Sequence, residues 1–189
     1  MLLHADLAED SAARFEALVK EERSTHFLID WDGTIYQMLD VANCAYHAGE
    51  MNQRSIGVDL NNLMPNLEKN PNASPWPKKH PRLAEMTAEE NLRILSRSAE
   101  INAARVKSYG YTRAQYRALG SLLRTLATMF PAIGAGPPRR SNGEVVSRVV
   151  DDPDRTPGVL AHWHVEADRW DPGPGFFWKR LGLDEVPAR

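Results

Sequence analysis

The chain has 189 residues, a formal net charge of -2 and 42% hydrophobic residues, a composition typical of a single soluble globular domain. Its nearly balanced charge gives no electrostatic reason to expect nucleic acid or an anionic membrane as a partner, and no apolar run approaches the roughly 20 residues of a membrane span. A single cysteine, Cys44, excludes an intrachain disulfide and a cysteine-rich zinc cluster.

The first residues, MLLHADLAEDSAARF, lack the basic segment, the long apolar segment and the small-residue cleavage site of a secretory signal. We therefore expect a cytoplasmic chain, or one that is exported without a Sec signal. A third alternative is that residues before Met1 are missing.

The N-terminal part of the chain predicts short strands and one helix. Residues 1–4, MLLH, have the apolar composition of a short strand. Asp10 or Ser11 is a suitable N-cap for a helix that ends near Arg23.

Two further strand signals follow. The apolar runs at 26–30 and 34–39 flank Trp31-Asp32-Gly33, and Asp-Gly between apolar runs is a strong hairpin signal. Residues 55–60 alternate in polarity, which places Asp59 on one strand face and three apolar side chains on the core face. Those core residues are Ile56, Val58 and Leu60.

The middle of the chain predicts helices around an irregular segment. Residues 64–81 are rich in Pro, Asn and Lys, which is typical of a surface loop. A capping-box pattern at Thr87 predicts a helix to about Lys107. Thr112 is suited to cap a second helix, through about Phe130, with leucines at helical spacing.

The C-terminal part predicts loop over 131–157, a last strand over 158–165 and a short helix over 176–182. No repeat or compositional break marks a second domain, so we expect one domain over 1–189. Strands and helices mixed in this order predict a single sheet with helices packed on it, in an α/β or α+β fold.

The segment HWHVEADRWDPGP suggests a metal site. It places His162 and Asp171 nine positions apart, and a turn restricted by Pro172 and Gly173 follows. That spacing suits a strand end and a following loop that converge on one point. Zinc binds His nitrogen and Asp oxygen, and catalytic zinc sites use three protein ligands, so one ligand is missing from this segment.

Spacing alone does not identify the third ligand. His80 lies in a Lys-Lys-His-Pro loop and is expected at the surface. His164 shares a strand face with His162 if the strand continues, so it is a candidate for contact with the ligand or with a substrate. The candidates left open for the third ligand are His4, His26 and His47.

Several segments together resemble the zinc-dependent N-acetylmuramoyl-L-alanine amidases of the amidase-2 group, which are related to peptidoglycan recognition proteins and phage amidase lysozymes. The segments are LLHAD with His4, HAGEMNQRSIGVD from His47 to Asp59, YTRAQYRALGSLL from Tyr111, and AHWHVEADRWDPGP from Ala161 to Pro174. The resemblance leaves about 61–108 as an insertion, which we expect to cover the groove or to dock a delivery partner.

The resemblance implies an α/β fold: a single mixed β-sheet flanked by helices, with a zinc cleft at one end of the strands. It selects His4, His162 and Asp171 as the ligands of Zn²⁺. It makes His26 a structural or site-lining residue, and it implies that substrate is contacted by His47 and Asn52, with His164 as a further candidate.

Two positions depart from the family pattern. Asp59 stands where the family has glutamate, and we expect it to act as the base that passes a proton to the leaving amine. Arg169 stands where the family usually has lysine, and we expect it to face the oxyanion. A misplacement of about 1 Å can cost on the order of 100-fold in rate, but both departures preserve charge, which favours a working enzyme.

The implied reaction is zinc-dependent hydrolysis of the amide between N-acetylmuramic acid and L-alanine, in peptidoglycan or a muropeptide. The alternatives are a catalytically inactive peptidoglycan-binding module of the same fold and a structural component. Recycling, lysis and toxin delivery would use the same site, so the residues do not distinguish these roles.

Other charged and aromatic residues have simpler interpretations. We expect solvated loop charges at Asp152, Asp154, Glu166 and Asp168. We expect about half of the C-terminal aromatic residues to line a substrate groove and the rest to be core; they are Trp163, Trp170, Phe176, Phe177 and Trp178.

Overall fold

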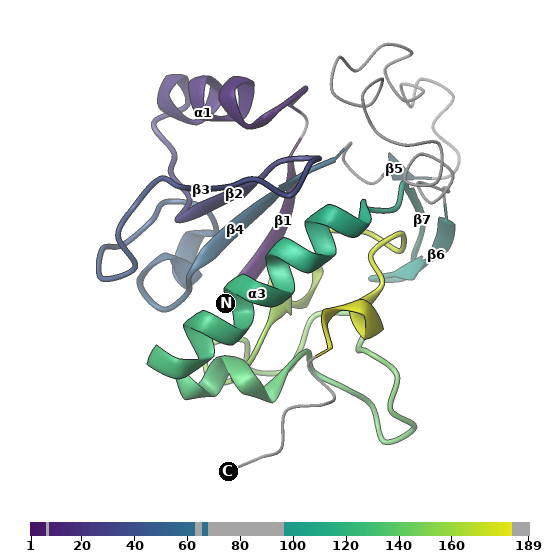
Figure 1. The fold of residues 1–189 in the computed structure, drawn as a ribbon. Coiled ribbons are helices and arrows are strands. Elements are labelled where there is room, and N and C mark those ends of the chain that lie inside the picture. Colours follow the sequence, from purple (N-terminus) through teal and green to yellow (C-terminus); the bar gives the residue numbers. More distant parts are fainter. Residues whose placement is uncertain (7, 63–65, 68–96, 183–189) are drawn as a thin grey trace.

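The computed structural model describes residues 1–6, 8–62, 66–67 and 97–182, and its centre is a five-stranded sheet with the order β3-β2-β4-β1-β8 (Figure 1). Neighbouring strands are parallel except at the β3 edge, which is antiparallel to β2. The predicted mixed sheet is therefore confirmed. Its strands are β1 (Leu2–Asp6), β2 (Phe27–Ile29), β3 (Ile35–Gln37), β4 (Gly57–Asn61) and β8 (Leu160–Ala161).

The two α-helices that the structure describes begin at predicted caps. In α1 (Ser11–Lys20), the Asp10 side chain accepts a hydrogen bond from the backbone of Ala13. In α3 (Arg113–Met129), Thr112 and Gln115 form a reciprocal capping box, which satisfies backbone donors at the helix start. None of the helices in the described part of the chain is long and apolar enough to cross a membrane.

The two faces of the sheet differ in polarity because side chains alternate along each strand. One face packs its apolar residues on the leucines of α3, and this contact forms the main core. The other face carries a row of polar side chains toward α1, with His4 beside Asp59 and Asp6 beside Asn61 in the parallel register. Alternation in β4 is as predicted, with Val58 and Leu60 in the core.

The helix predicted from Thr87 to Lys107 is wrong over its described part. Residues 97–108 form an antiparallel hairpin, β6 (Arg97–Ile101) and β7 (Ala104–Ser108), and β5 (Asn66–Leu67) pairs with β7. Asn102 and Ala103 both have positive φ, as a two-residue hairpin turn requires. Asparagine tolerates that conformation and was the missed signal. Residues 87–96 of the prediction lie outside the described residues, and so does most of the predicted 64–81 segment.

The strand predicted over 158–165 is also wrong in its second half. After Ala161 the chain turns into a 3₁₀ helix, His162–His164. The His162 backbone N–H bonds to the Asp171 carbonyl instead of a neighbouring strand. The predicted terminal helix is a 3₁₀ helix at Trp178–Leu181, and 131–157 is mostly irregular as expected.

Candidate metal centre and its cleft

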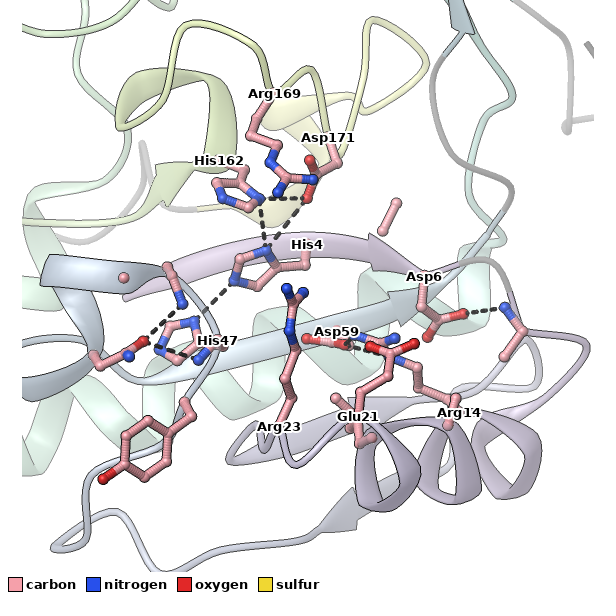
Figure 2. Close-up of a pocket in the computed structure, with 18 of the residues that line it drawn as sticks. His4, Asp6, Arg14, Glu21, Arg23, His47, Asp59, His162, Arg169 and Asp171 are labelled. Atoms are coloured by element: carbon pink, nitrogen blue, oxygen red, sulfur yellow. Dashed lines mark hydrogen bonds and ion pairs between the residues drawn. The ribbon is translucent and has the colours of Figure 1, made fainter.

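A cavity of about 910 Å³ lies on the polar face of the sheet. Its walls come from β1, β4, α1, the loop at 46–52 and the C-terminal segment at 162–171. Figure 2 shows residues from all these elements pointing into one space. Since α3 fills the opposite face, this is the face left free for a ligand.

Three side chains converge at one end of this cavity. His4 comes from the middle of β1, His162 directly follows β8, and Asp171 lies nine positions after His162. Their ring nitrogens and carboxylate oxygen form a small triangle: His4 Nδ1 is 3.1 Å from His162 Nδ1 and 3.3 Å from Asp171 Oδ2, which is 3.2 Å from His162 Nδ1. All three residues are buried.

This triangle fits a metal ion. Ligand atoms at bond lengths of about 2.0–2.2 Å around a tetrahedral zinc lie roughly 3.4 Å apart. Two buried atoms of the cluster, Asp171 Oδ1 and His162 Nε2, have no hydrogen-bond partner in the described residues. Burial alone would raise the pKa of Asp171, but the adjacent His162 and His4 side chains outweigh burial and lower that pKa below its ordinary value. The buried His-His-Asp cluster can therefore bind a metal ion.

A chain of hydrogen bonds sets the tautomer of His4. The Ser55 hydroxyl donates to the Met51 carbonyl at 2.7 Å, so its oxygen accepts from His47 Nε2 at 3.2 Å. His47 Nδ1 is then the acceptor for His4 Nε2–H at 2.9 Å. His4 Nδ1 consequently carries a free lone pair that faces the triangle, as a metal ligand must.

His47 is held neutral by its surroundings. Burial, together with the nearby His4 and His26 rings, lowers the pKa of His47 to about 3. A Cβ at Gly57 would lie 2.9 Å from the His47 ring, so glycine leaves the space in which this ring stands. Asn52 Oδ1 accepts hydrogen bonds from the backbone N–H groups of His47 and Ala48 and so shapes the loop. His47 and Asn52 both line the cavity, and their contact with substrate stays a prediction.

Asp59 stands next to His4 on the neighbouring strand, and sequence reasoning missed its partner. The Arg14 guanidinium extends from α1 toward the sheet and donates from Nε and Nη2 to Asp59 Oδ2, both at 2.7 Å (Figure 2). Burial opposes the charge on Arg14, but Asp59 and Asp6 raise its pKa above the ordinary value. Arg14 faces Asp59 because it lies on the inward side of α1 with the buried Ser11 and Leu18.

A second carboxyl group lies beside this ion pair. Asp6 accepts hydrogen bonds from Asn61 Nδ2 to both its oxygens, at 3.0 and 2.9 Å. Burial, followed by repulsion from Asp59, raises the pKa of Asp6 well above its usual value. The cleft floor therefore holds two carboxyl groups close to one arginine.

Arg169 lies beside His162 and Asp171 at the upper rim of the cleft (Figure 2). Its Nε donates to Glu166 Oε2 at 3.3 Å, and Glu166 Oε1 is 3.5 Å from His162 Nε2. The expectation that Glu166 is a solvated loop charge is therefore wrong: it is partly buried, lines the cavity and contacts two site residues.

Two of the histidines in the described ranges lie away from the cavity. His164 is fully buried, accepts from the Ala161 N–H and contacts the Val146 carbonyl at 2.6 Å. It was predicted to share a face with His162, but that required a strand which ends at Ala161. His26 Nδ1 accepts from the Gly57 N–H, so its role is structural.

The C-terminal aromatic residues do not line this cavity. Trp163 and Phe176 are buried in the core. The prediction that about half of these aromatic residues line a substrate groove is therefore wrong for this cavity. The aromatic side chain in the cavity wall is Tyr46, which is 64% exposed and precedes His47 in the loop. The Tyr-His-Ala-Gly sequence was the signal that could have identified it.

Comparisons with known proteins agree with this geometry. The family model Amidase_2, described as N-acetylmuramoyl-L-alanine amidase, matches residues 3–174. No curated protein matches the chain.

Among solved structures, a complex of the Escherichia coli N-acetylmuramyl-L-alanine amidase AmiD with anhydro-N-acetylmuramic acid-L-Ala-D-γ-Glu-L-Lys is similar, with 17% identity and a TM-score of 0.56 over 99% of this chain and 57% of that one. AmpDh3 of Pseudomonas aeruginosa in complex with anhydromuramic pentapeptide has 20% identity and a TM-score of 0.57, over 99% of this chain and 59% of that one. The amidase LysC of Clostridium intestinale has 14% identity and a TM-score of 0.54, over 97% of this chain and 82% of that one. This chain thus spans less than two thirds of the first two proteins, and at these identities the likeness shows the fold.

Proposed function

Since this chain belongs to the Amidase_2 family of N-acetylmuramoyl-L-alanine amidases, we propose that it hydrolyses the amide between N-acetylmuramic acid and L-alanine with a zinc ion held by His4, His162 and Asp171. The observation that carries the proposal is the convergence of two histidine nitrogens and one carboxylate oxygen in a cavity. Zinc bound there would supply a Lewis acid for the amide carbonyl and a more acidic water.

Asp59 is the proposed base. It lies beside His4 in the parallel register, on the face that lines the cavity. From there it takes a proton from the attacking water and passes it to the leaving amine. Arg14 donates to the Asp59 carboxylate from two nitrogens and so holds it in one orientation.

Arg169 is the proposed cation for the oxyanion of the tetrahedral intermediate. It lies at the rim beside Asp171, and its side chain is 41% exposed, so it faces the space that substrate would enter. A positive group placed where negative charge develops lowers the barrier without reorganisation.

The proposed substrate is a muropeptide. The volume of about 910 Å³ is at the upper end of small-molecule sites and accommodates a sugar with part of a stem peptide. The complexes of AmiD and AmpDh3 with anhydromuramic peptides support this choice of substrate class.

The test measures metal content together with release of free stem peptide from a defined muropeptide. We expect about one zinc per wild-type chain, and loss of both zinc and turnover in His162→Ala. Asp59→Asn should keep its zinc and lose activity by about 100-fold or more. A wild-type chain that binds no zinc would overturn the metal site and the amidase together.

One observation favours a second candidate, a binding module without catalysis. Both proposed catalytic side chains already have partners: Asp59 is paired with Arg14, and Arg169 with Glu166. A chain that binds zinc and muropeptide but releases no stem peptide would establish this alternative.

A further inference from the structure

Glu166 lies between two groups of the proposed site. One carboxylate oxygen is 3.5 Å from His162 Nε2, and the other accepts from Arg169 Nε at 3.3 Å. We infer that Glu166 is a positioning residue, which orients the metal ligand His162 and holds the cation Arg169 at the rim of the cleft. This role rests on the proposed function and extends it to a residue outside the ligand triangle.

The ring of His162 needs an acceptor on its outer side. If Nδ1 ligates the metal ion together with His4 and Asp171, the proton of the neutral ring is on Nε2. That nitrogen is buried and makes no hydrogen bond to the described residues at the present 3.5 Å from Glu166. A carboxylate behind a metal-bound histidine sets its tautomer and ring orientation, and a small rotation of Glu166 completes this contact.

The backbone fixes Glu166 in this place. Its N–H donates to the His162 carbonyl at 3.1 Å, so the turn sets the acid above the ring four residues earlier. The Arg169 N–H donates to the Glu166 carbonyl at 3.3 Å, which continues the turn. Asn102, from the β6–β7 hairpin, donates to the carbonyls of Trp163 and Glu166, both at 3.2 Å. The carboxylate therefore projects from a braced segment and not from a free loop.

The same carboxylate restrains Arg169. An arginine carries several rotatable bonds, and an ion pair with Glu166 reduces the range of positions its guanidinium samples. The hydrogen bond to Glu166 uses the Nε–H of Arg169, and a guanidinium has five N–H donors, so the fork has further donors for a substrate oxygen.

The experiment measures zinc affinity, by competition with a chromophoric chelator, for the full chain and three variants. Glu166→Ala should weaken zinc binding about 10- to 100-fold, because the acceptor behind His162 is lost. Glu166→Gln keeps an acceptor and should bind zinc within a few-fold of wild type, while its kcat falls because Arg169 loses its charge partner. Asp168 is an exposed acid in the same turn, so Asp168→Asn is the charge-matched control. It should leave the zinc affinity and kcat unchanged.

The outcomes separate this role from the site itself. Equal zinc affinity in Glu166→Ala and wild type, with zinc bound by both, would overturn the positioning role and leave the amidase proposal standing. Absence of zinc from wild type would overturn the proposed function first. Glu166→Gln behaving like Glu166→Ala in zinc affinity would also contradict an acceptor role, and circular dichroism of each variant excludes a folding defect.

Discussion

At the scale of single residues, the ion pair of Arg14 and Asp59 determines the electrostatics of the cleft floor. Asp59 is almost fully buried and Arg14 is only partly exposed, so solvent screens the pair weakly. Without Arg14, the buried carboxyl groups of Asp59 and Asp6 would lie near each other without the guanidinium that now contacts Asp59.

This predicts a large effect of Arg14→Gln. Breaking a buried ion pair from one side leaves an uncompensated charge, so we expect a loss of about 3 kcal/mol in the free energy of unfolding, measured with urea. The double variant Arg14→Gln with Asp59→Asn should recover part of that loss, because the buried charge is removed as well. Additive losses in this double-mutant cycle would show that the two side chains do not interact.

At the scale of elements, the site depends on segments whose conformation is set by distant contacts. The turn at 162–169 is held by Asn102 of the β6–β7 hairpin, within the predicted 61–108 insertion. This assigns part of that region a supporting contact, while a covering or docking role stays a prediction. α3 has the opposite character, since its cap and apolar stripe are local in sequence and were predicted directly.

The cap of α3 offers a test at this scale. Thr112 accepts from the Gln115 N–H through its hydroxyl and donates to the Trp31 carbonyl at 2.7 Å, so one side chain serves both the helix and the hairpin loop. Thr112→Ala should lower the free energy of unfolding by roughly 1–2 kcal/mol. Thr112→Ser keeps the hydroxyl and should stay within about 0.5 kcal/mol of wild type. Equal losses in the two variants would mean that the methyl group matters and the cap does not.

At the scale of the whole molecule, one sheet serves two purposes. Its α3 face forms an apolar core, and its α1 face carries histidines and carboxyl groups. Burial lowers the pKa of a histidine such as His47 and raises the pKa of a carboxyl group such as Asp6. Stability is therefore expected to depend on pH through several groups at once. His164 is the clearest of them because it is fully buried and lies outside the cleft.

Burial lowers the pKa of His164 to about 4, below the ordinary value near 6.5. Between these values the unfolded chain binds a proton that the folded chain does not, so this contribution to stability falls as pH falls from 6.5 toward 4. The pKa values of Asp6 and His162 are raised, so their contributions to stability change with pH in the opposite direction. Comparing zinc-free wild type with His164→Gln isolates the contribution of His164, because both proteins contain these other groups. Wild type should lose roughly 2 kcal/mol more than the variant over this range. If the free energies of unfolding of wild type and His164→Gln, measured with urea, changed in parallel with pH, this prediction would be contradicted.

The sequence alone determined the features that depend on neighbouring residues. Helix caps at Asp10 and Thr112, the Asp-Gly hairpin and the alternation of β4 follow from local geometry, and each is confirmed. The metal triad was inferred from a family resemblance, because His4 lies 158 positions from His162 and spacing could not choose among the histidines.

Only the tertiary structure decided which groups meet across the fold. The contacts of Arg14 with Asp59, His47 with His4, and Asn102 with the 162–169 turn join residues far apart in the chain, so no local pattern encodes them. The end of β8 at Ala161 was equally hidden, since it depends on a hydrogen bond between His162 and Asp171. Local propensity sets where elements begin, but long-range packing and hydrogen bonding set which side chains form the cleft.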